Sequence, residues 1–118
     1  MSKILLIEDQ RWLGRMFVQI LSSAGYKTKY VLSAEEAEQA ADFAADLLLI
    51  DNGLPGKKGI KALPDLKKIF PQAKLVVLSN FSKKEYGAKA RAQGADEFWN
   101  KTETIGQLPE YVKQILGN

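Results

Sequence analysis

The sequence predicts an α/β fold, a doubly wound parallel sheet of five strands with five helices on its two faces. Short apolar runs alternate with amphipathic stretches along the whole chain, which is the pattern of strands joined by helices. A length of 118 residues suits one domain with a single core. Because 46% of the residues are hydrophobic and 26% are charged, the composition is that of a globular protein and excludes wholesale disorder.

The first strand and the first helix have the clearest patterns. Lys3–Glu8 is almost continuously apolar and predicts a buried strand. From about Gln10 to Ala24 apolar side chains recur at helical spacing, and Gly25 follows where a helix would end. The predicted inward face of this helix consists of Leu13, Met16, Phe17, Ile20, Leu21 and Ala24.

The next two elements are shorter. Lys27–Leu32 is a more polar strand, which suits the edge of a sheet. Ser33-Ala34-Glu35-Glu36 is a capping-box pattern that opens a second helix. The alanines expected to face inward from this helix are Ala37, Ala40, Ala41 and Ala44.

The middle of the chain continues the alternation. Leu47–Asp51 is a second strongly buried strand, and the loop from Asn52 to Gly59 follows it. A third helix is expected to run to about Phe70, with Pro64 tolerated only in its first turn.

The last elements complete the sheet. Lys74–Ser79 is predicted as strand four, Lys83–Gln93 as a helix stopped by Gly94, Asp96–Asn100 as strand five and about Ile105–Leu116 as the closing helix. Such alternation implies parallel strands, with the apolar strands 1, 3 and 4 at the centre and the polar strands 2 and 5 at the edges. The flavodoxin-like order 2-1-3-4-5 fits this pattern. We expect residues 1–118 to form one domain without a second, output module.

Several classes of function are excluded by composition. The chain has no cysteine and no histidine, so disulfides, zinc fingers and Ser-His-Asp triads are ruled out. A net charge of +3 is well short of a nucleic-acid-binding signature. No apolar run approaches the roughly 20 residues of a membrane span, and the amino terminus turns acidic before a signal peptide could form. We therefore expect a cytoplasmic protein without a direct nucleic-acid or membrane partner.

The chemistry of the chain is expected at the carboxyl ends of the strands, where ligands bind in open sheets of this class. The residues at these ends are Glu8, Asp9, Asp51, Ser79 and Lys101. Three carboxylates held together repel one another unless a cation intervenes, and Mg²⁺ suits such an oxygen-lined site. Lys101 and Ser79 would bind the oxygens of a PO₃ group in transit to the Asp51 carboxylate.

Taken together, these residues resemble the receiver domain of two-component response regulators, and the resemblance covers the whole chain. The motifs that carry it are Glu8-Asp9, Asp51-Asn52-Gly53-Leu54-Pro55 with Gly59, Ser79 after an apolar strand, and Lys101 after Gly94-Ala95-Asp96. Their order and their places at strand ends make the combination specific.

The resemblance implies a role for each residue. Asp51 would accept phosphate from a histidine kinase or a histidine phosphotransfer protein, with Lys101 and Ser79 as the other catalytic groups. The residues implied to hold Mg²⁺ are Glu8, Asp9, Asp51 and the Gly53 carbonyl. Ser79 would also be the switch hydroxyl and Phe98 the switch aromatic.

The resemblance also implies a docking face for a downstream protein, formed by helix four, strand five and helix five. The expected protein is a monomer, or a dimer that forms on phosphorylation. The phosphorylated domain is expected to switch conformation and then to dock this partner or to relay the phosphate. No reaction on an external substrate is expected, only self-phosphorylation from a donor and autodephosphorylation.

Four residues near these motifs stand out. Asn80 replaces the small residue usual in the family, and Thr102 replaces the proline that often follows the lysine, so no cis peptide bond is expected there. Trp12 and Trp99 are expected to be partly buried packing residues. Since Trp99 follows Phe98 in a strand, the two should face opposite ways.

Three other functions stay open at this point. An FMN-binding carrier would need hydroxyl and glycine donors after strand one, where Glu8-Asp9 places anions instead. A small Mg²⁺-dependent phosphohydrolase would need a separate general acid, which is not apparent. A receiver-fold interaction module that works without phosphorylation would not need so complete an acidic site.

Overall fold

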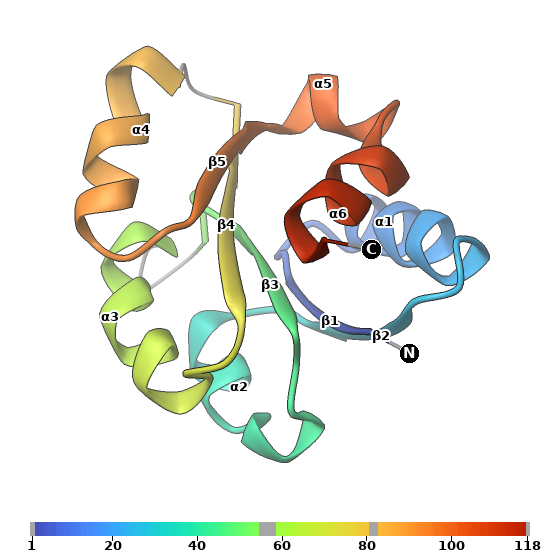
Figure 1. Cartoon of the computed structure of the whole chain (residues 1–118), viewed down its shortest axis with the longest axis horizontal. Helices are drawn as coiled ribbons and strands as arrows, with labels where there is room; N and C mark the ends of the chain where they lie inside the picture. The colour runs from blue at the N-terminus through green and yellow to red at the C-terminus, as the bar shows by residue number, and fades with distance from the viewer. Residues whose placement is uncertain (1, 55–58, 81–82, 118) are drawn as a thin grey trace.

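The computed structural model is built on one parallel sheet with the strand order β2-β1-β3-β4-β5 (Figure 1). The structure describes residues 2–54, 59–80 and 83–117, the side chains at 83–85 excepted. The strands are β1 (Lys3–Ile7), β2 (Lys27–Val31), β3 (Leu47–Asp51), β4 (Lys74–Ser79) and β5 (Glu97–Asn100). The helices are α1 (Arg11–Ser23), α2 (Ala34–Glu38), the 3₁₀ helix η1 (Ala41–Phe43), α3 (Gly59–Ile69), α4 (Lys83–Ala92), α5 (Lys101–Ile105) and α6 (Leu108–Leu116). The predicted fold class and strand order are confirmed.

Helices cover both faces of the sheet, as Figure 1 shows, with α1 and α6 on one side and α2, α3 and α4 on the other. Along β1, Ile4 and Leu6 point to the first face, whereas Leu5 and Ile7 point to the second. A strand covered on both faces must be apolar on both, which explains the unbroken apolar run of β1 and of β3. The more polar strands β2 and β5 lie at the edges, as predicted.

The end of the chain contains one helix more than predicted. The described residues contain six α-helices, not five, because two helices replace the single one expected from about Ile105 to Leu116. The side chain of Asn100 accepts a hydrogen bond from the Glu103 N–H at 3.0 Å, so α5 begins directly after β5. Pro109 lies in the first turn of α6, a position where proline favours a new helix start.

The second helix is shorter than predicted. Its start is confirmed, since Ser33 Oγ accepts a hydrogen bond from the Glu36 N–H at 3.1 Å. The prediction that Ala41 and Ala44 face inward is wrong, because both are exposed while Ala37 and Ala40 are buried. The helix ends at Glu38, and Ala44 takes a left-handed conformation (φ 54°) that leads the chain toward β3.

Two other details of the helices differ from expectation. Pro64 lies inside α3 and not in its first turn. Proline has no N–H, so the helix lacks the hydrogen bond that residue 64 would donate to the Ile60 carbonyl, and Pro64 itself is exposed. The buried stripe of α1 is narrow, so Met16 is 38% exposed and Trp12 is 63% exposed. Ala24, the residue that follows the helix, is also exposed. Trp12 is therefore a surface residue, contrary to the prediction.

Candidate functional site

The carboxyl ends of β1 and β3 bring three carboxylates together. Glu8 and Asp9 follow the last residue of β1, and Asp51 is the last residue of β3. One carboxylate oxygen from each of the three lies within 4.8 Å of the others. Glu8 is completely buried and Asp51 is 5% exposed, whereas Asp9 is exposed. The sequence predicted this cluster, because parallel strands end at the same edge of a sheet.

Lys101 joins two of these carboxylates. Its Nζ atom lies 2.7 Å from Glu8 Oε1 and 3.2 Å from Asp51 Oδ1. Lys101 is only 6% exposed, and the Asn100 cap that starts α5 fixes the backbone from which it projects. The sequence anticipated the contact with Asp51 but not the shorter one with Glu8. Adjacent acids are equivalent in a sequence, and only the fold decides that Glu8 is the buried one.

The electrostatics of the site follow from burial and proximity. Burial raises the pKa of the Glu8 carboxyl to about 7, with the Lys101 ammonium opposing this rise and the neighbouring Asp51 adding to it. Burial by itself would lower the pKa of Lys101. Its contacts with Glu8 and Asp51 outweigh that effect and leave the pKa above its usual value. Lys101 is therefore charged at neutral pH, while Glu8 lies close to its titration midpoint.

Backbone N–H groups orient both buried carboxylates. The Gln10 N–H donates to Glu8 Oε2 at 3.1 Å, and the Gly53 N–H donates to Asp51 Oδ1 at 2.9 Å. The loop after β3 is itself held by β4, because the Asn52 N–H donates to the Leu78 carbonyl at 2.9 Å. The acids are thus aimed by their own loops, and Lys101 is the cation between them.

A pocket of about 210 Å³ opens onto this cluster. Its lining residues are Asp9, Gln10, Asp51, Gly53, Ser79, Asn80 and Lys101. Ser79 is 2% exposed at the end of β4, whereas Asn80 is exposed. Of the residues predicted for the site, Asp9, Asp51, Gly53, Ser79 and Lys101 therefore share one pocket, and Glu8 lies behind it. Pro55 to Lys58 lie outside the described residues.

The donor set fits a hard divalent cation. The atoms available are carboxylate oxygens of Glu8, Asp9 and Asp51, which are the ligands that Mg²⁺ prefers. One ammonium group cannot balance three carboxylates, so negative charge remains for a metal ion to neutralise. The exposed carboxylate of Asp9 leaves one side of the cluster accessible to an ion that keeps part of its water shell.

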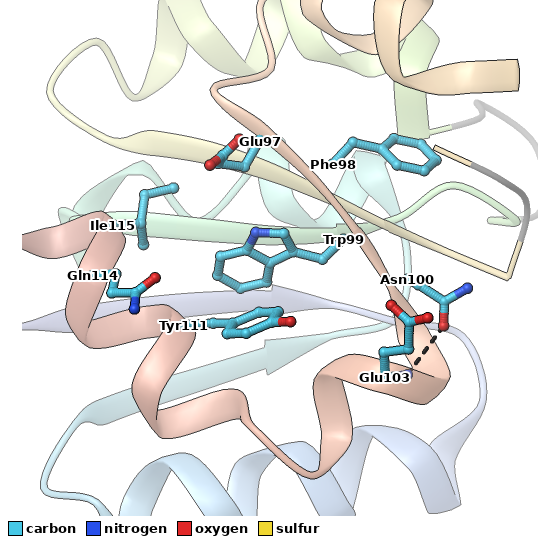
Figure 2. Close-up of a pocket in the computed structure, with 8 residues that line it drawn as sticks. All are labelled: Glu97, Phe98, Trp99, Asn100, Glu103, Tyr111, Gln114 and Ile115. Carbon is cyan, nitrogen blue, oxygen red and sulfur yellow. Dashed lines mark hydrogen bonds between the residues drawn. The ribbon is translucent and has the colours of Figure 1, made fainter. Parts of the chain in front are cut away.

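Phe98 and Trp99 leave β5 toward opposite faces of the sheet, as predicted. Phe98 is 2% exposed and packs in the core beneath α2, α3 and α4. Trp99 packs on the other face, with its ring 5.2 Å from that of Tyr111 in an edge-on contact at 65° (Figure 2). Both line a second hollow of about 420 Å³ beside β5 and α6. The peptide bond between Lys101 and Thr102 is trans, as expected.

Two residues at the site were not anticipated from the sequence. Gln10 lines the pocket and supports Glu8 through its N–H group. Tyr30, on the edge strand β2, donates its hydroxyl hydrogen to the Glu8 carbonyl at 2.7 Å. Nothing in the local pattern of β2 distinguishes Tyr30 from an ordinary strand tyrosine, because the contact spans 22 positions of sequence.

None of the helices in the described ranges combines the length and the apolar character that crossing a bilayer requires.

Comparison with known proteins places this arrangement in a family. The model of the response regulator receiver domain matches residues 4–113. Protein CcdB of Bacillus subtilis is 29% identical over 124 residues, covering 100% of both chains. The chemotaxis protein CheY of Thermotoga maritima is 26% identical, covering 97% of both chains. The chain spans only between 24% and 55% of three other relatives.

The solved structures agree on the fold. A CheY-like response regulator receiver domain protein from Methanospirillum hungatei superimposes with a TM-score of 0.90 at 24% identity, covering 99% of this chain and 94% of that one. The family match extends over almost the whole chain and includes the acid pair, Asp51 and Lys101, which the fold gathers at one edge of the sheet. The chain therefore belongs to the receiver domain family of two-component response regulators.

Proposed function

We propose that this chain is a phosphorylatable response regulator in which Asp51 accepts a phosphoryl group from a histidine kinase or a histidine phosphotransfer protein. The observation that carries the proposal is the position of Lys101 Nζ, 3.2 Å from Asp51 and 2.7 Å from Glu8, beside a pocket that Ser79 also lines. The proposal takes residues 1–118 as one receiver domain that acts in the cytoplasm.

The geometry supports a direct transfer to Asp51. An Asp51 carboxylate oxygen would form a bond to phosphorus while the P–N bond of the donor phosphohistidine breaks and the nitrogen keeps the electron pair. The contacts from Gly53 N–H and Lys101 both reach Oδ1, so we assign the attack to Oδ2. The Lys101 ammonium and the Ser79 hydroxyl would pair with the phosphoryl oxygens as charge develops on them.

The residues proposed to hold Mg²⁺ are Glu8, Asp9, Asp51 and the Gly53 carbonyl. The ion, when bound, supplies positive charge that neutralises the phosphoryl oxygens. Asp9 is suited to direct contact because it is exposed at the pocket. Glu8 is suited to contact through water, because its carboxylate already pairs with Lys101.

Mass spectrometry after incubation with acetyl phosphate and MgCl₂ tests the proposal. The wild-type chain should gain one phosphoryl group, and Asp51→Asn should gain none. Asp42→Asn is the matched control, because Asp42 is an exposed aspartate in η1, away from the cluster. Lys101→Ala should still bind Mg²⁺ but lose phosphorylation or the response to it.

The results separate the alternatives. Stoichiometric labelling of Asp51→Asn would show that another residue is modified. A wild-type chain that stays unlabelled with acetyl phosphate and with histidine kinases would favour an interaction module that works without phosphorylation. A yellow purified protein would instead indicate an FMN carrier. Continuous release of phosphate from external esters would indicate a phosphohydrolase.

We also propose that a downstream protein docks on the face formed by α4, β5 and α6, the helices that correspond to the predicted helices four and five. The 420 Å³ hollow on this face is lined by the carboxylates of Glu97 and Glu103 and by the rings of Trp99 and Tyr111 (Figure 2). Glu97 also pairs with Arg91 at 2.9 Å, but the described lining residues themselves include no basic side chain. Such a surface suits a partner segment that carries lysine or arginine.

A further inference from the structure

The edge strand β2 holds the main chain of the acidic loop at two points. The Glu8 N–H donates to the Val31 carbonyl at 3.1 Å, which continues the β1–β2 ladder by one residue. The Glu8 carbonyl accepts the hydroxyl hydrogen of Tyr30 at 2.7 Å. The same hydroxyl lies 3.5 Å from the Gln10 carbonyl, at the outer limit of a hydrogen bond. The carbonyl groups of Glu8 and Gln10, the residues on either side of Asp9, therefore face one phenol group.

Helix α1 makes room for this tyrosine. Gly14 is buried in α1, and a Cβ atom built there would overlap the Cζ and Oη atoms of Tyr30. Glycine in the interior of a helix costs roughly 0.5–1 kcal/mol relative to alanine, so its presence calls for a steric reason. The reason is the Tyr30 ring, which can cross α1 at this position only because Gly14 has no side chain.

We propose that Tyr30 is a positioning residue that fixes the Glu8–Asp9–Gln10 loop so that the two acids face the phosphoryl-accepting pocket. The inference rests on the proposed Mg²⁺ and phosphoryl site and adds a residue from outside that pocket. Tyr30 does not line the pocket. It acts through the carbonyl of Glu8, whose side chain pairs with Lys101 and whose neighbour Asp9 opens onto the pocket.

The Tyr30 hydroxyl matches the chemistry of the atom that it contacts. The Glu8 carbonyl oxygen can only accept a hydrogen bond, and the Tyr30 hydroxyl donates one to it at 2.7 Å.

The test is a Mg²⁺ titration of the full chain, followed by the backbone-amide NMR shifts of Asp51 and Gly53, with NaCl of matched ionic strength as the salt control. Tyr30→Phe removes only the hydroxyl and should raise the Kd for Mg²⁺ roughly three- to tenfold, the equivalent of one hydrogen bond. Tyr26→Phe is the control, because Tyr26 is partly buried just before β2 and packs beneath α1.

Gly14→Ala tests the same contact from the opposite element. The added methyl group should displace the Tyr30 ring and weaken Mg²⁺ binding as Tyr30→Phe does, while alanine itself favours the helix. At saturating Mg²⁺ the phosphorylation rate of both variants should return toward that of the wild type. Such a split between affinity and rate would not result from a general loss of stability.

The outcomes are distinguishable. If the wild-type chain does not respond to Mg²⁺ beyond the NaCl control, the proposed function fails and this inference fails with it. If the wild type binds Mg²⁺ and both Tyr30→Phe and Gly14→Ala bind it with unchanged affinity, only the inference is overturned. An equal loss of affinity in Tyr26→Phe would also overturn it.

Discussion

Glu8 and Asp9 are adjacent acids in unlike surroundings. Glu8 is completely buried and paired with Lys101 at 2.7 Å, whereas Asp9 is exposed at the pocket. Burial raises the pKa of Glu8 to about 7 even with Lys101 beside it. Glu8 is therefore only partly ionised near neutral pH, which makes the site sensitive to pH in that range.

Stability of the metal-free protein should fall as pH rises from about 4.5 to about 7, because the Glu8 pKa is raised from 4.5 in the unfolded chain to about 7 in the folded state. Between these values the folded state binds more protons than the unfolded chain, so raising the pH favours unfolding. The contribution of Glu8 to the free energy of unfolding is fully present below pH 4.5, and it amounts to about 3 kcal/mol at most. Urea unfolding in EDTA across this range measures it.

Glu8→Gln is the control for this dependence, since it keeps the shape of the side chain and removes its titration. The difference between the wild-type and Glu8→Gln free energies of unfolding should change with pH in the stated window. A constant difference from pH 4.5 to 7.5 would show that Glu8 is not held in the buried, proton-binding environment described above.

At the scale of elements, β5 connects the acidic site to the proposed docking face. Its residue Phe98 faces the core, Trp99 faces Tyr111 of α6, and Asn100 caps the helix that carries Lys101. A phosphoryl group on Asp51 is expected to draw Ser79 toward it and so to change the packing of Phe98, which is already buried in the core. Trp99 is the next residue of β5. The change should therefore shift the balance between two arrangements of the Trp99 ring against Tyr111.

Trp99 fluorescence should therefore change when beryllofluoride, a phosphoryl mimic, is added with Mg²⁺. The chain has two tryptophans, so the measurement uses a Trp12→Phe background to remove the exposed, unrelated one. The Asp51→Asn variant in the same background should show no change. Identical Trp99 spectra with and without the mimic would count against coupling through β5.

The start of α3 packs directly against the end of β3. A Cβ atom at Gly59 would lie 2.6 Å from the Asp51 carbonyl oxygen and 3.0 Å from Ile50 Cγ2. Gly59→Ala should therefore push α3 away from the strand that carries Asp51 and destabilise the fold by about 1–3 kcal/mol.

Gly106→Ala is the matched control for Gly59→Ala. A Cβ atom there meets no heavy atom within 4 Å, and the φ of −74° suits alanine. This variant should be neutral or should stabilise by up to about 1 kcal/mol. Thermal unfolding of the two variants compares them, and an equal effect of both would contradict the close approach of α3 to β3.

At the scale of the whole molecule, folding gathers three carboxylates around one ammonium group. Mg²⁺ should bind the folded state only and stabilise it by about 1.4 kcal/mol at a tenfold excess over Kd. For a domain of this size the melting temperature should rise by about 4–6 °C. Calorimetry with MgCl₂, against NaCl of equal ionic strength, measures the effect.

Asp51→Asn removes one of these charges at nearly constant shape. It should melt at a higher temperature than the wild type in metal-free buffer and gain less from Mg²⁺, because less repulsion remains to be relieved. A lower metal-free melting temperature for Asp51→Asn, or no advantage of Mg²⁺ over NaCl, would contradict an electrostatically strained acidic cluster.

The prediction of the fold from the sequence succeeded where the signal was periodic and failed where it depended on single contacts. The continuous apolar runs of β1 and β3 and the polar edge strands predicted the sheet, since burial on two faces demands apolar residues at every position. The break between α5 and α6 was not predicted, because apolar spacing continues through Gly106. Exposure of Ala41 and Ala44 was missed because alanine fits either environment.

For the site, the sequence alone determined that Glu8, Asp9, Asp51, Ser79 and Lys101 lie at one edge of the sheet. Parallel strands all end on the same side, so residue order is sufficient to place them there. Only the tertiary structure decided that Glu8 is the buried acid, that Lys101 bridges it to Asp51, and that Tyr30 holds its carbonyl through a gap left by Gly14. These contacts join residues far apart in the chain, and their distances depend on how helices and strands pack, which no local pattern encodes.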